Sequence, residues 1–327
     1  MERYPATRRR RSGVVVQGSR ESLFSSVGLA AGMLATAVAS AKAQLPPGGE
    51  RADGTSQAPL NAVRESPRHH ELSWWSAAPL TEPLETDRPD FTEGTSTVPR
   101  GHFQLEGGYT FVYGRENGTR SRTHTAPELL LRAGLADNFE LRIGWEGYTW
   151  LNEQARGRTR AGRPVTVEEG TQGGADTYVG FKWKLLDQEG LRPDFAIIPA
   201  VTVPGGSSGF SSGDVDPEIK LAWSYGLGER WSVGGNVNLA APTDGGKRFF
   251  QSGASVALGY ELLERVGAYV EYFGFYPNAR GADCAHTLNT GLTWRLTDNL
   301  QLDWRIGAGL NEEAEDFFTG VGFAFRF

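Results

Sequence analysis

Residues 317–327 read FFTGVGFAFRF, and two kinds of residue alternate along this stretch. Every second residue from Phe317 to Phe327 is Phe, Thr or Val, whereas the positions between them hold Phe318, small residues and Arg326. Side chains of a β-strand point to opposite faces with a period of two. The stretch therefore predicts a strand that keeps one apolar face up to the end of the printed sequence.

The same alternation recurs through the preceding two hundred or so residues. Residues 300–310 and 285–296 both alternate, and Thr297-Asp298-Asn299 between them is typical of a tight hairpin turn. We expect about twelve strands, near 103–113, 123–135, 139–150, 174–185, 194–203, 215–225, 231–241, 249–260, 265–276, 285–296, 300–310 and 317–327. An even number of such strands is typical of bacterial membrane barrels.

The connections between these strands alternate strictly between short and long. Short connections are expected at 136–138, 186–193, 226–230, 261–264 and 297–298, and longer ones at 114–122, 151–173, 204–214, 242–248, 277–284 and 311–316. An outer-membrane barrel has short turns on its periplasmic rim and longer loops outside, and a soluble β-sandwich has no reason for such an alternation. The sequence predicts an all-β fold, a transmembrane antiparallel up-and-down barrel.

Aromatic residues gather at the predicted strand ends. One set lies on the short-turn rim, namely Phe103, Phe139, Trp183, Phe195, Tyr225, Trp231, Tyr260, Trp294 and Phe327. A second set lies on the long-loop rim, namely Tyr113, Trp150, Phe249, Tyr276 and Phe317. Aromatic belts form at the two membrane interfaces. The apolar faces are therefore expected to contact lipid, where an open sheet edge would leave backbone groups unpaired, so the sheet must close.

The composition excludes other classes of protein. With 39% hydrophobic residues, mean hydropathy −0.39 and net charge −6, the chain does not read as a bundle of membrane-spanning helices. The acidic balance gives no indication of a nucleic-acid partner. Cys284 is the only cysteine, so no intrachain disulfide can form.

The N-terminal third of the sequence has a different character. Arg8 to Arg11 precede an apolar run at 23–41 that ends in Ala41-Lys42-Ala43, which predicts a secretory signal peptide over 1–43; an anchoring helix is the alternative. Residues 44–101 are rich in Pro, Ser, Thr and charge, and we expect a disordered or extended periplasmic segment. The barrel is expected over 102–327.

With the apolar residues outside, the charged residues of the strands face the lumen. A basic residue on the lipid face would cost about 2 to 4 kcal/mol near the midplane. The expected lumen-lining residues are Glu106, Glu128, Arg132, Glu140, Arg142, Glu146, Asp176, Lys182, Lys184, Glu218, Lys220, Glu271, Arg295, Asp303, Arg305 and Arg326. Tyr148, Tyr178, Tyr269, Phe273 and Phe275 are expected to point inward as well. Acids and bases are balanced, so the lumen is either an open pore with selective charged rings or a closed interior of ion pairs.

Three stretches carry a family resemblance. Residues 85–93 read ETDRPDFTE, residues 97–110 read TVPRGHFQLEGGYT, and residues 127–142 hold PELLLRAGL and NFELR. They resemble the outer-membrane transporter family named for the MetA pathway of phenol degradation, over about residues 85 to 327. The resemblance implies a barrel that moves solutes across the outer membrane, and it does not identify the solute.

Asp87, Arg88, Pro89, Asp90 and Phe91 stand just before the first predicted strand. They can plug the pore by pairing with lumen charges, or they can belong to a solvated linker. The expected function is passive or facilitated passage of a small solute, with no cofactor, no metal and no covalent step. The expected partners are outer-membrane lipid and lipopolysaccharide, and the barrel-assembly machinery through the C-terminal strand ending at Phe327.

Two other functions stay open. An outer-membrane hydrolase needs a nucleophile, a base and an orienting group within reach of one another, and His124 and His286 are the only candidate bases near the outer rim. A structural or adhesive barrel without transport, binding a partner through 151–173, is the other possibility. The acidic run at 312–316 reads as a solvated turn or a contact to divalent cations of lipopolysaccharide.

Overall fold

The computed structural model describes residues 77–116, 118–158 and 163–327. The signal peptide predicted over 1–43 and most of the segment predicted over 44–101 lie outside the described residues. In the described part of the chain, no helix is long and apolar enough to cross a membrane.

Alternating residues from Phe103 onward form antiparallel strands. The strands are β1 (Phe103–Glu116), β2 (Thr119–Ala136), β3 (Phe139–Trp145), β4 (Tyr148–Arg158), β5 (Pro164–Gly174), β6 (Thr177–Leu186), β7 (Asp194–Val203), β8 (Asp216–Leu227), β9 (Trp231–Ala240), β10 (Thr243–Asp244), β11 (Lys247–Arg248), β12 (Gln251–Leu263), β13 (Val266–Tyr276), β14 (Ala285–Thr297), β15 (Leu300–Gly309) and β16 (Phe317–Arg326). Over the described residues, all except β10 and β11 join one 14-stranded sheet.

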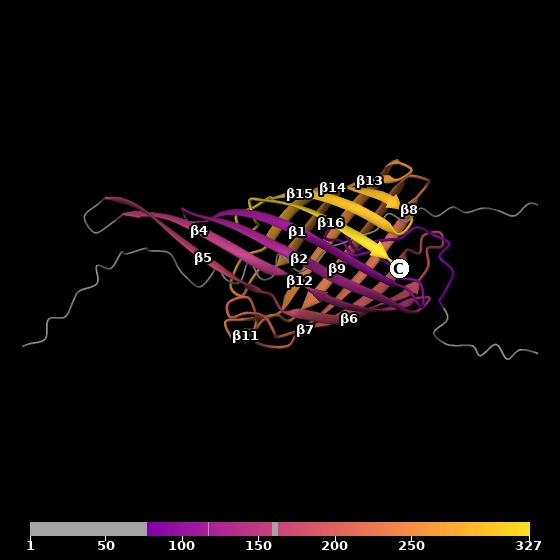
Figure 1. Cartoon of the computed structure of the whole chain (residues 1–327), viewed down its shortest axis with the longest axis horizontal. Helices are drawn as coiled ribbons and strands as arrows, with labels where there is room; N and C mark the ends of the chain where they lie inside the picture. Colours follow the sequence, from indigo (N-terminus) through magenta and orange to yellow (C-terminus); the bar gives the residue numbers. More distant parts are fainter. Residues whose placement is uncertain (1–76, 117, 159–162) are drawn as a thin grey trace, which may run out of the picture.

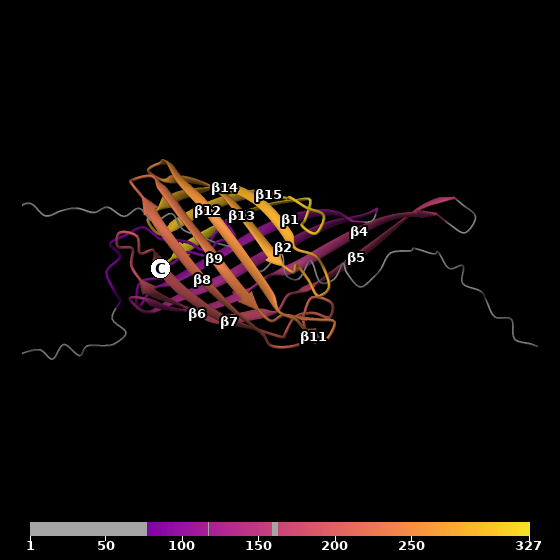
Figure 2. The same ribbon diagram turned by 180° about the vertical axis from the view of Figure 1, so that it is seen from behind.

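The sheet closes on itself because β1 pairs with both β2 and β16. At the seam, the Phe103 N–H donates to the Phe327 carbonyl and the Phe327 N–H donates to the Phe103 carbonyl, each at 2.9 Å. β3 continues into β4, and β5 continues into β6, so each of these two pairs crosses the barrel wall as one strand. The 14 strands of the described chain therefore occupy twelve strand positions in the wall. Figures 1 and 2 show the tilted strands from opposite sides. The prediction of a closed antiparallel barrel of about twelve strands is confirmed.

Two of the predicted long loops are strands instead. Residues 114–116 continue β1 and residues 119–122 belong to β2. Most of 151–173 forms the hairpin of β4 and β5, which projects beyond the barrel (Figure 1). Most residues of β5 are exposed, and the polar side chains among them are Thr166, Glu168, Glu169 and Gln172. A hairpin surrounded by water needs no apolar face, so its alternation disappears although its backbone pairing continues.

The two kinds of residue that alternate along β16 lie on different faces of the barrel wall. Val321, Phe323, Phe325 and Phe327 are 51%, 37%, 44% and 56% exposed, whereas Ala324 is fully buried. Across the barrel, the exposed large side chains are mainly Val, Leu, Trp and Phe. Because a continuous apolar exterior of this kind is stable in hydrocarbon and not in water, the exterior is a lipid-facing surface.

The inward register of β2 changes along its length. Arg132 and Glu128 are buried near its end, but Thr123 and Thr125 are the buried residues before the Ala126-Pro127 irregularity. The inward register changes in the same way between β3 and β4 of the neighbouring strand position. Thr149 of β4 is buried there and pairs with Thr125. The prediction that Tyr148 points inward is therefore wrong. Its ring packs beside the exposed Trp150, with centroids 4.8 Å apart.

Candidate functional site

Residues 84–99, here called the luminal segment, lie inside the barrel. The chain reaches the rim that carries the C-terminus (Figure 1), where the Leu84 N–H donates to the Asp298 carbonyl at 2.7 Å. It returns along the wall, where the Val98 N–H donates to Glu140 Oε2 at 2.7 Å. The sequence predicts a disordered or extended periplasmic segment at 44–101, with Asp87 to Phe91 as a possible plug. The structure instead encloses this part of it, and the residues from 86 to 95 are all buried.

Asp87 lies at the centre of a cluster of lumen cations. Its carboxylate pairs with Lys182 at 2.7 Å, with Arg132 at 3.4 Å and with Arg142. Its backbone N–H donates to both carboxylate oxygens of Glu106 at 3.0 Å. A buried carboxylate is stable only when opposite charges and hydrogen bonds replace its lost water. The three cations meet this condition for Asp87.

Glu93 forms the second anionic contact of the luminal segment. Its carboxylate accepts from Arg142 at 2.7 Å and pairs with Lys220. Asn236 binds the backbone of the same residue on both sides, since its Oδ1 accepts from the Glu93 N–H at 2.6 Å and its Nδ2 donates to the Glu93 carbonyl at 2.9 Å. Lysines and arginines of β3, β6 and β8 thus hold one end of the segment.

Arg88 has the opposite charge, and its partners come from β15 and β2. Its guanidinium donates to both carboxylate oxygens of Asp303 at 3.2 Å and to Glu128 at 3.3 Å. Two inward glycines, Gly108 of β1 and Gly322 of β16, leave room for it, because a Cβ on either would overlap the guanidinium. The bidentate geometry with Asp303 fixes both the position and the orientation of Arg88.

Glu271 of β13 binds the backbone of the segment between Arg88 and Glu93. It accepts from the N–H groups of Phe91 and Thr92 at 2.8 and 2.6 Å and from the Thr92 hydroxyl at 2.7 Å. The Phe91 ring stacks on Phe273 with centroids 4.4 Å apart. Wall side chains therefore satisfy much of a backbone that has no strand pairing of its own.

The structure brings together most of the predicted lumen residues. Those that contact the luminal segment directly are Glu106, Glu128, Arg132, Glu140, Arg142, Lys182, Lys220, Glu271 and Asp303. Arg326 binds the chain just before the segment, through the Glu82 carbonyl at 2.7 Å. Each of these side chains comes from the inward register of its strand.

The other predicted lumen residues lie away from the segment. Lys184 pairs with Asp187 and Asp194 at the short-turn rim. Asp176 accepts from the N–H groups of Gly205, Gly206 and Ser212, and so holds the connection between β7 and β8. Three further residues line cavities, namely Arg295, Glu146 and Glu218, and Arg305 lines a pocket above the segment.

The sequence analysis missed the uncharged polar contacts of the luminal segment. Besides Asn236, Gln104 donates to the Glu85 carbonyl at 2.8 Å, Gln301 donates to Thr86 Oγ1 at 3.0 Å, and Ser255 Oγ lies 2.7 Å from Thr92 Oγ1. All of these residues occupy inward positions of alternating strands. An uncharged amide or hydroxyl at an inward position is the available signal, whereas the predicted lumen residues are all charged or aromatic.

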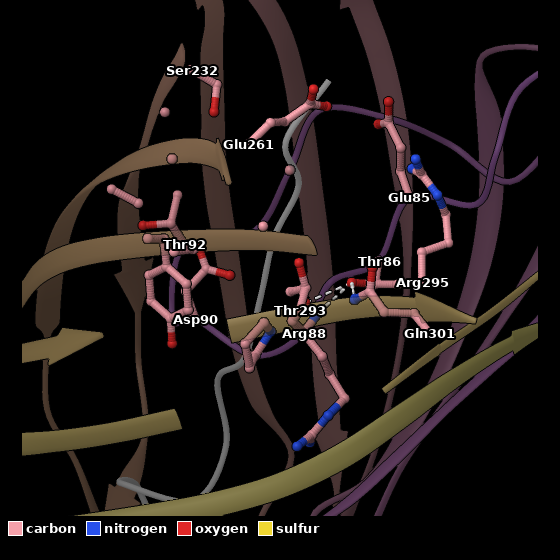
Figure 3. Close-up of a pocket in the computed structure, with 18 of the residues that line it drawn as sticks. Glu85, Thr86, Arg88, Asp90, Thr92, Ser232, Glu261, Thr293, Arg295 and Gln301 are labelled. Carbon is pink, nitrogen blue, oxygen red and sulfur yellow. Dashed lines mark hydrogen bonds between the residues drawn. The ribbon is translucent and has the colours of Figure 1, made fainter. Parts of the chain in front are cut away.

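Two cavities, here called vestibules, lie toward the two rims of the barrel. The first lies at the short-turn rim, has an empty volume of about 900 Å³ including its open mouth, and is lined by Arg88, Asp90, Thr92, Arg295 and Gln301. Figure 3 shows these side chains converging from the segment and the wall. The second lies under the long loops, has about 1410 Å³, and is lined by Glu146, Tyr178 and Glu218. Segment residues line the first cavity directly, whereas Glu218 of the second lies 3.6 Å from Lys220, which pairs with Glu93 of the segment.

The candidate bases of a hydrolase have other partners. The His124 ring is hydrogen-bonded to the Tyr109 hydroxyl at 2.9 Å, and the His286 ring to the Tyr272 hydroxyl at 2.6 Å. Within the described residues, no group of three or more His, Cys, Asp or Glu side chains is arranged to hold a metal ion.

The barrel is similar to several solved outer-membrane proteins. An outer membrane channel from Pseudomonas putida F1 aligns with a TM-score of 0.48 and 16% identity, covering 71% of this chain and 98% of that one. The NanC porin aligns with a TM-score of 0.42 and 9% identity over 68% and 98% of the two chains. The KdgM porin aligns with a TM-score of 0.40 and 14% identity over 68% and 99%.

Sequence comparison gives the family. No curated protein sequence matches the chain significantly. A family profile matches residues 86–327, which include most of the luminal segment and the whole barrel. The chain belongs to the family described as "Putative MetA-pathway of phenol degradation".

Proposed function

We propose that the protein is an outer-membrane channel for small solutes in which the luminal segment is a movable plug. The observation that carries this proposal is the position of the segment inside a barrel that has a vestibule lined by polar residues toward each rim. A barrel that served only as an anchor would need no hydrated cavity at either end. Passage from one vestibule to the other requires the segment to move.

The contacts that hold the luminal segment can be exchanged for contacts with a solute. The segment is held mainly by side chains such as Asp303, Glu271 and Lys182, and none of its residues belongs to a strand. A hydrated, charged solute can replace such side-chain contacts one at a time. If the segment were a strand, its release would require breaking all its backbone hydrogen bonds to the neighbouring strands. The solute then moves down its gradient without a covalent step.

The orientation follows from the two rims. We place the short-turn rim, with Phe327 and the start of the luminal segment, on the periplasmic side, and the β4–β5 hairpin outside. In this orientation the last strand, which ends at Phe327, is available to the barrel-assembly machinery, and the lipid face contacts phospholipid and lipopolysaccharide.

Deletion of residues 85–93 tests the plug. The refolded deletion variant is expected to give single-channel steps in planar bilayers several times larger than those of the full barrel, because the two vestibules become continuous. A heat-dependent shift in electrophoretic mobility verifies that the deleted barrel has closed. A folded deletion variant with unchanged conductance would contradict the plug.

A permanently closed, structural barrel is the second candidate. The density of ion pairs around Asp87 and Glu93 favours it, since each partner stabilises the interior without any passage. It predicts that the full barrel carries no current and does not swell solute-loaded liposomes, even if the deletion variant does.

A further inference from the structure

A pocket lies between the luminal segment and the loop at 310–316. It has an empty volume of about 680 Å³ including its open mouth, and its walls include the rings of Phe91, Phe273, Phe275 and Phe318 together with Arg305. Apolar walls with one convergent cation are typical of sites for amphipathic anions.

Arg305 is the unusual member of this pocket. It is only 6% exposed, and no carboxylate in the described part of the chain lies within 4.0 Å of its guanidinium. One terminal nitrogen donates to Thr110 Oγ1 at 2.7 Å, and the guanidinium carbon lies 5.4 Å above the Phe318 ring. Its buried Nε–H has no hydrogen-bond partner among the described residues.

Three other buried arginines of the lumen are paired with carboxylates. Arg88, Arg132 and Arg142 each form ion pairs with at least two carboxylates. A buried cation with an unused donor is costly unless a further acceptor completes its contacts. A guanidinium presents its donors in one plane, which matches the two oxygens of a carboxylate.

We propose that this pocket binds a small organic anion with an aromatic body, whose carboxylate accepts from Arg305 and whose ring packs among the four phenylalanines. The inference deepens the proposed function and rests on it, since it names the solute class. Aromatic rings pack favourably in offset and edge-on arrangements, and the wall already contains both, because Phe91 stacks on Phe273 and meets Phe275 edge-on with centroids 5.4 Å apart.

The charges at the mouth limit the class further. Glu313 and Glu315 of the loop at 310–316 also line the pocket. A second negative charge on the ligand would be repelled there, so a monoanion is favoured over a dianion. Phe91 forms part of the pocket and belongs to the luminal segment, so a ligand bound here contacts the proposed plug directly.

Binding of benzoate by the purified full barrel in detergent, measured by titration calorimetry, tests the site. Benzyl alcohol has the ring without the charge, and acetate has the charge without the ring. We expect benzoate to bind at least tenfold more tightly than either. The contradicting result is equal affinity for benzoate and benzyl alcohol, or no measurable affinity for benzoate.

Variants locate the site. Arg305→Gln should weaken benzoate about tenfold or more, the amount expected for one charge-assisted hydrogen bond, and Arg305→Lys should lose less because it keeps the charge. Arg295→Gln, at the opposite rim, is the matched control and should not change the affinity. Unchanged binding by Arg305→Gln would overturn the assignment.

A second variant covers the case in which Arg305→Gln does not fold. Phe318→Leu keeps an apolar wall but removes one ring, and it should weaken benzoate several-fold; unchanged affinity would contradict the aromatic wall. These titrations need no membrane gradient. If benzoate binds but the barrel does not conduct, the binding site is supported and the proposed channel is contradicted. If the barrel conducts but benzoate does not bind, the channel is supported and the binding site is contradicted.

Discussion

Lys182 Nζ lies 2.7 Å from Oδ1 of Asp87, although the two residues are 95 positions apart in the chain. Neither side chain is more than 1% exposed, so the pair joins the luminal segment to the wall in the absence of bulk water. Breaking a buried pair by removing one partner costs about 3 to 5 kcal/mol. The contact therefore contributes strongly to holding the segment in the lumen.

Asp87→Asn is expected to release the luminal segment part of the time. Arg132, Arg142 and Lys182 lose their shared counter-ion and repel one another, which favours opening. A single cysteine at Thr92, placed in a Cys284→Ser background, should react with a maleimide at least tenfold faster in the Asp87→Asn variant.

Glu85→Gln is the matched control for this measurement. It removes the same charge from the same segment, but no ion pair of the Glu85 side chain is present among the described residues. Equal labelling rates for the two variants would show that Asp87 does not hold the segment.

The barrel could be predicted from the sequence more completely than its contents. The alternation that ends at Phe327 depends on contact with lipid, which acts on every exposed side chain in the same way, so each strand repeats the signal. The luminal segment has no period, because each of its residues meets a different wall side chain. Asp87 and Arg88 could be identified as charges near the mouth, but their partners depend on strand register and depth in the lumen, which sequence spacing does not determine.

Gly322→Ala should displace Arg88. A Cβ at this position overlaps the guanidinium, and the overlap can be relieved only if Arg88 leaves Asp303 and Glu128. We expect larger single-channel conductance and a lower midpoint of thermal unfolding. Gly157→Ala, also in a strand, meets no atom closer than 3.8 Å and serves as the control. If the two variants behave alike, the close approach of Arg88 has no functional role.

The loop at 310–316 should respond to pH near neutrality. Burial, followed by repulsion from Asp316 and Glu116, raises the pKa of Glu315 from its ordinary value of 4.5 to about 7. A carboxyl whose pKa is raised by folding favours the folded state at low pH, and this advantage is lost as pH rises from about 4.5 to 7. The other charges that line this region are those of Arg115 of β1 and of Glu312 and Glu313 of the same loop, and Arg305 shares a second pocket with Glu315.

Hydrogen exchange of the Gly309 amide, which donates to the Glu315 carbonyl at 2.8 Å, measures this effect. After correction for the intrinsic rate, protection should fall between pH 5 and pH 8, and Glu315→Gln should remove the dependence. The exposed Glu312→Gln variant should retain it. A pH-independent protection factor in the unmodified protein would contradict the role of Glu315.

The terminal Phe327 should matter more for assembly in cells than for the stability of the finished barrel. Its ring is 56% exposed and packs only against Phe325 and Phe103 among the aromatic rings of the described chain. We expect Phe327→Ala to reduce the amount of folded barrel in outer-membrane fractions several-fold, while refolding in detergent changes little. Phe325→Ala, on the same face, is the control. Equal membrane levels of the two variants would remove the proposed role in assembly.

A reversible crosslink between the luminal segment and the wall shows whether solutes cross only when the segment moves. Thr92 Oγ1 lies 2.7 Å from Ser255 Oγ, so cysteines at both positions in a Cys284→Ser background are close enough to form a disulfide. Thr125 and Thr149, whose hydroxyls lie 3.1 Å apart, join two wall strands and provide a matched pair that leaves the segment free.

Single-channel recording of both double-cysteine variants, before and after reduction, is the measurement. A movable plug predicts that the oxidised Thr92→Cys, Ser255→Cys barrel is silent, that reduction restores the steps of the Cys284→Ser barrel, and that the wall crosslink has no effect in either state. Full conductance through the oxidised, segment-locked barrel would contradict the account, because solutes would then cross without any movement of residues 84–99.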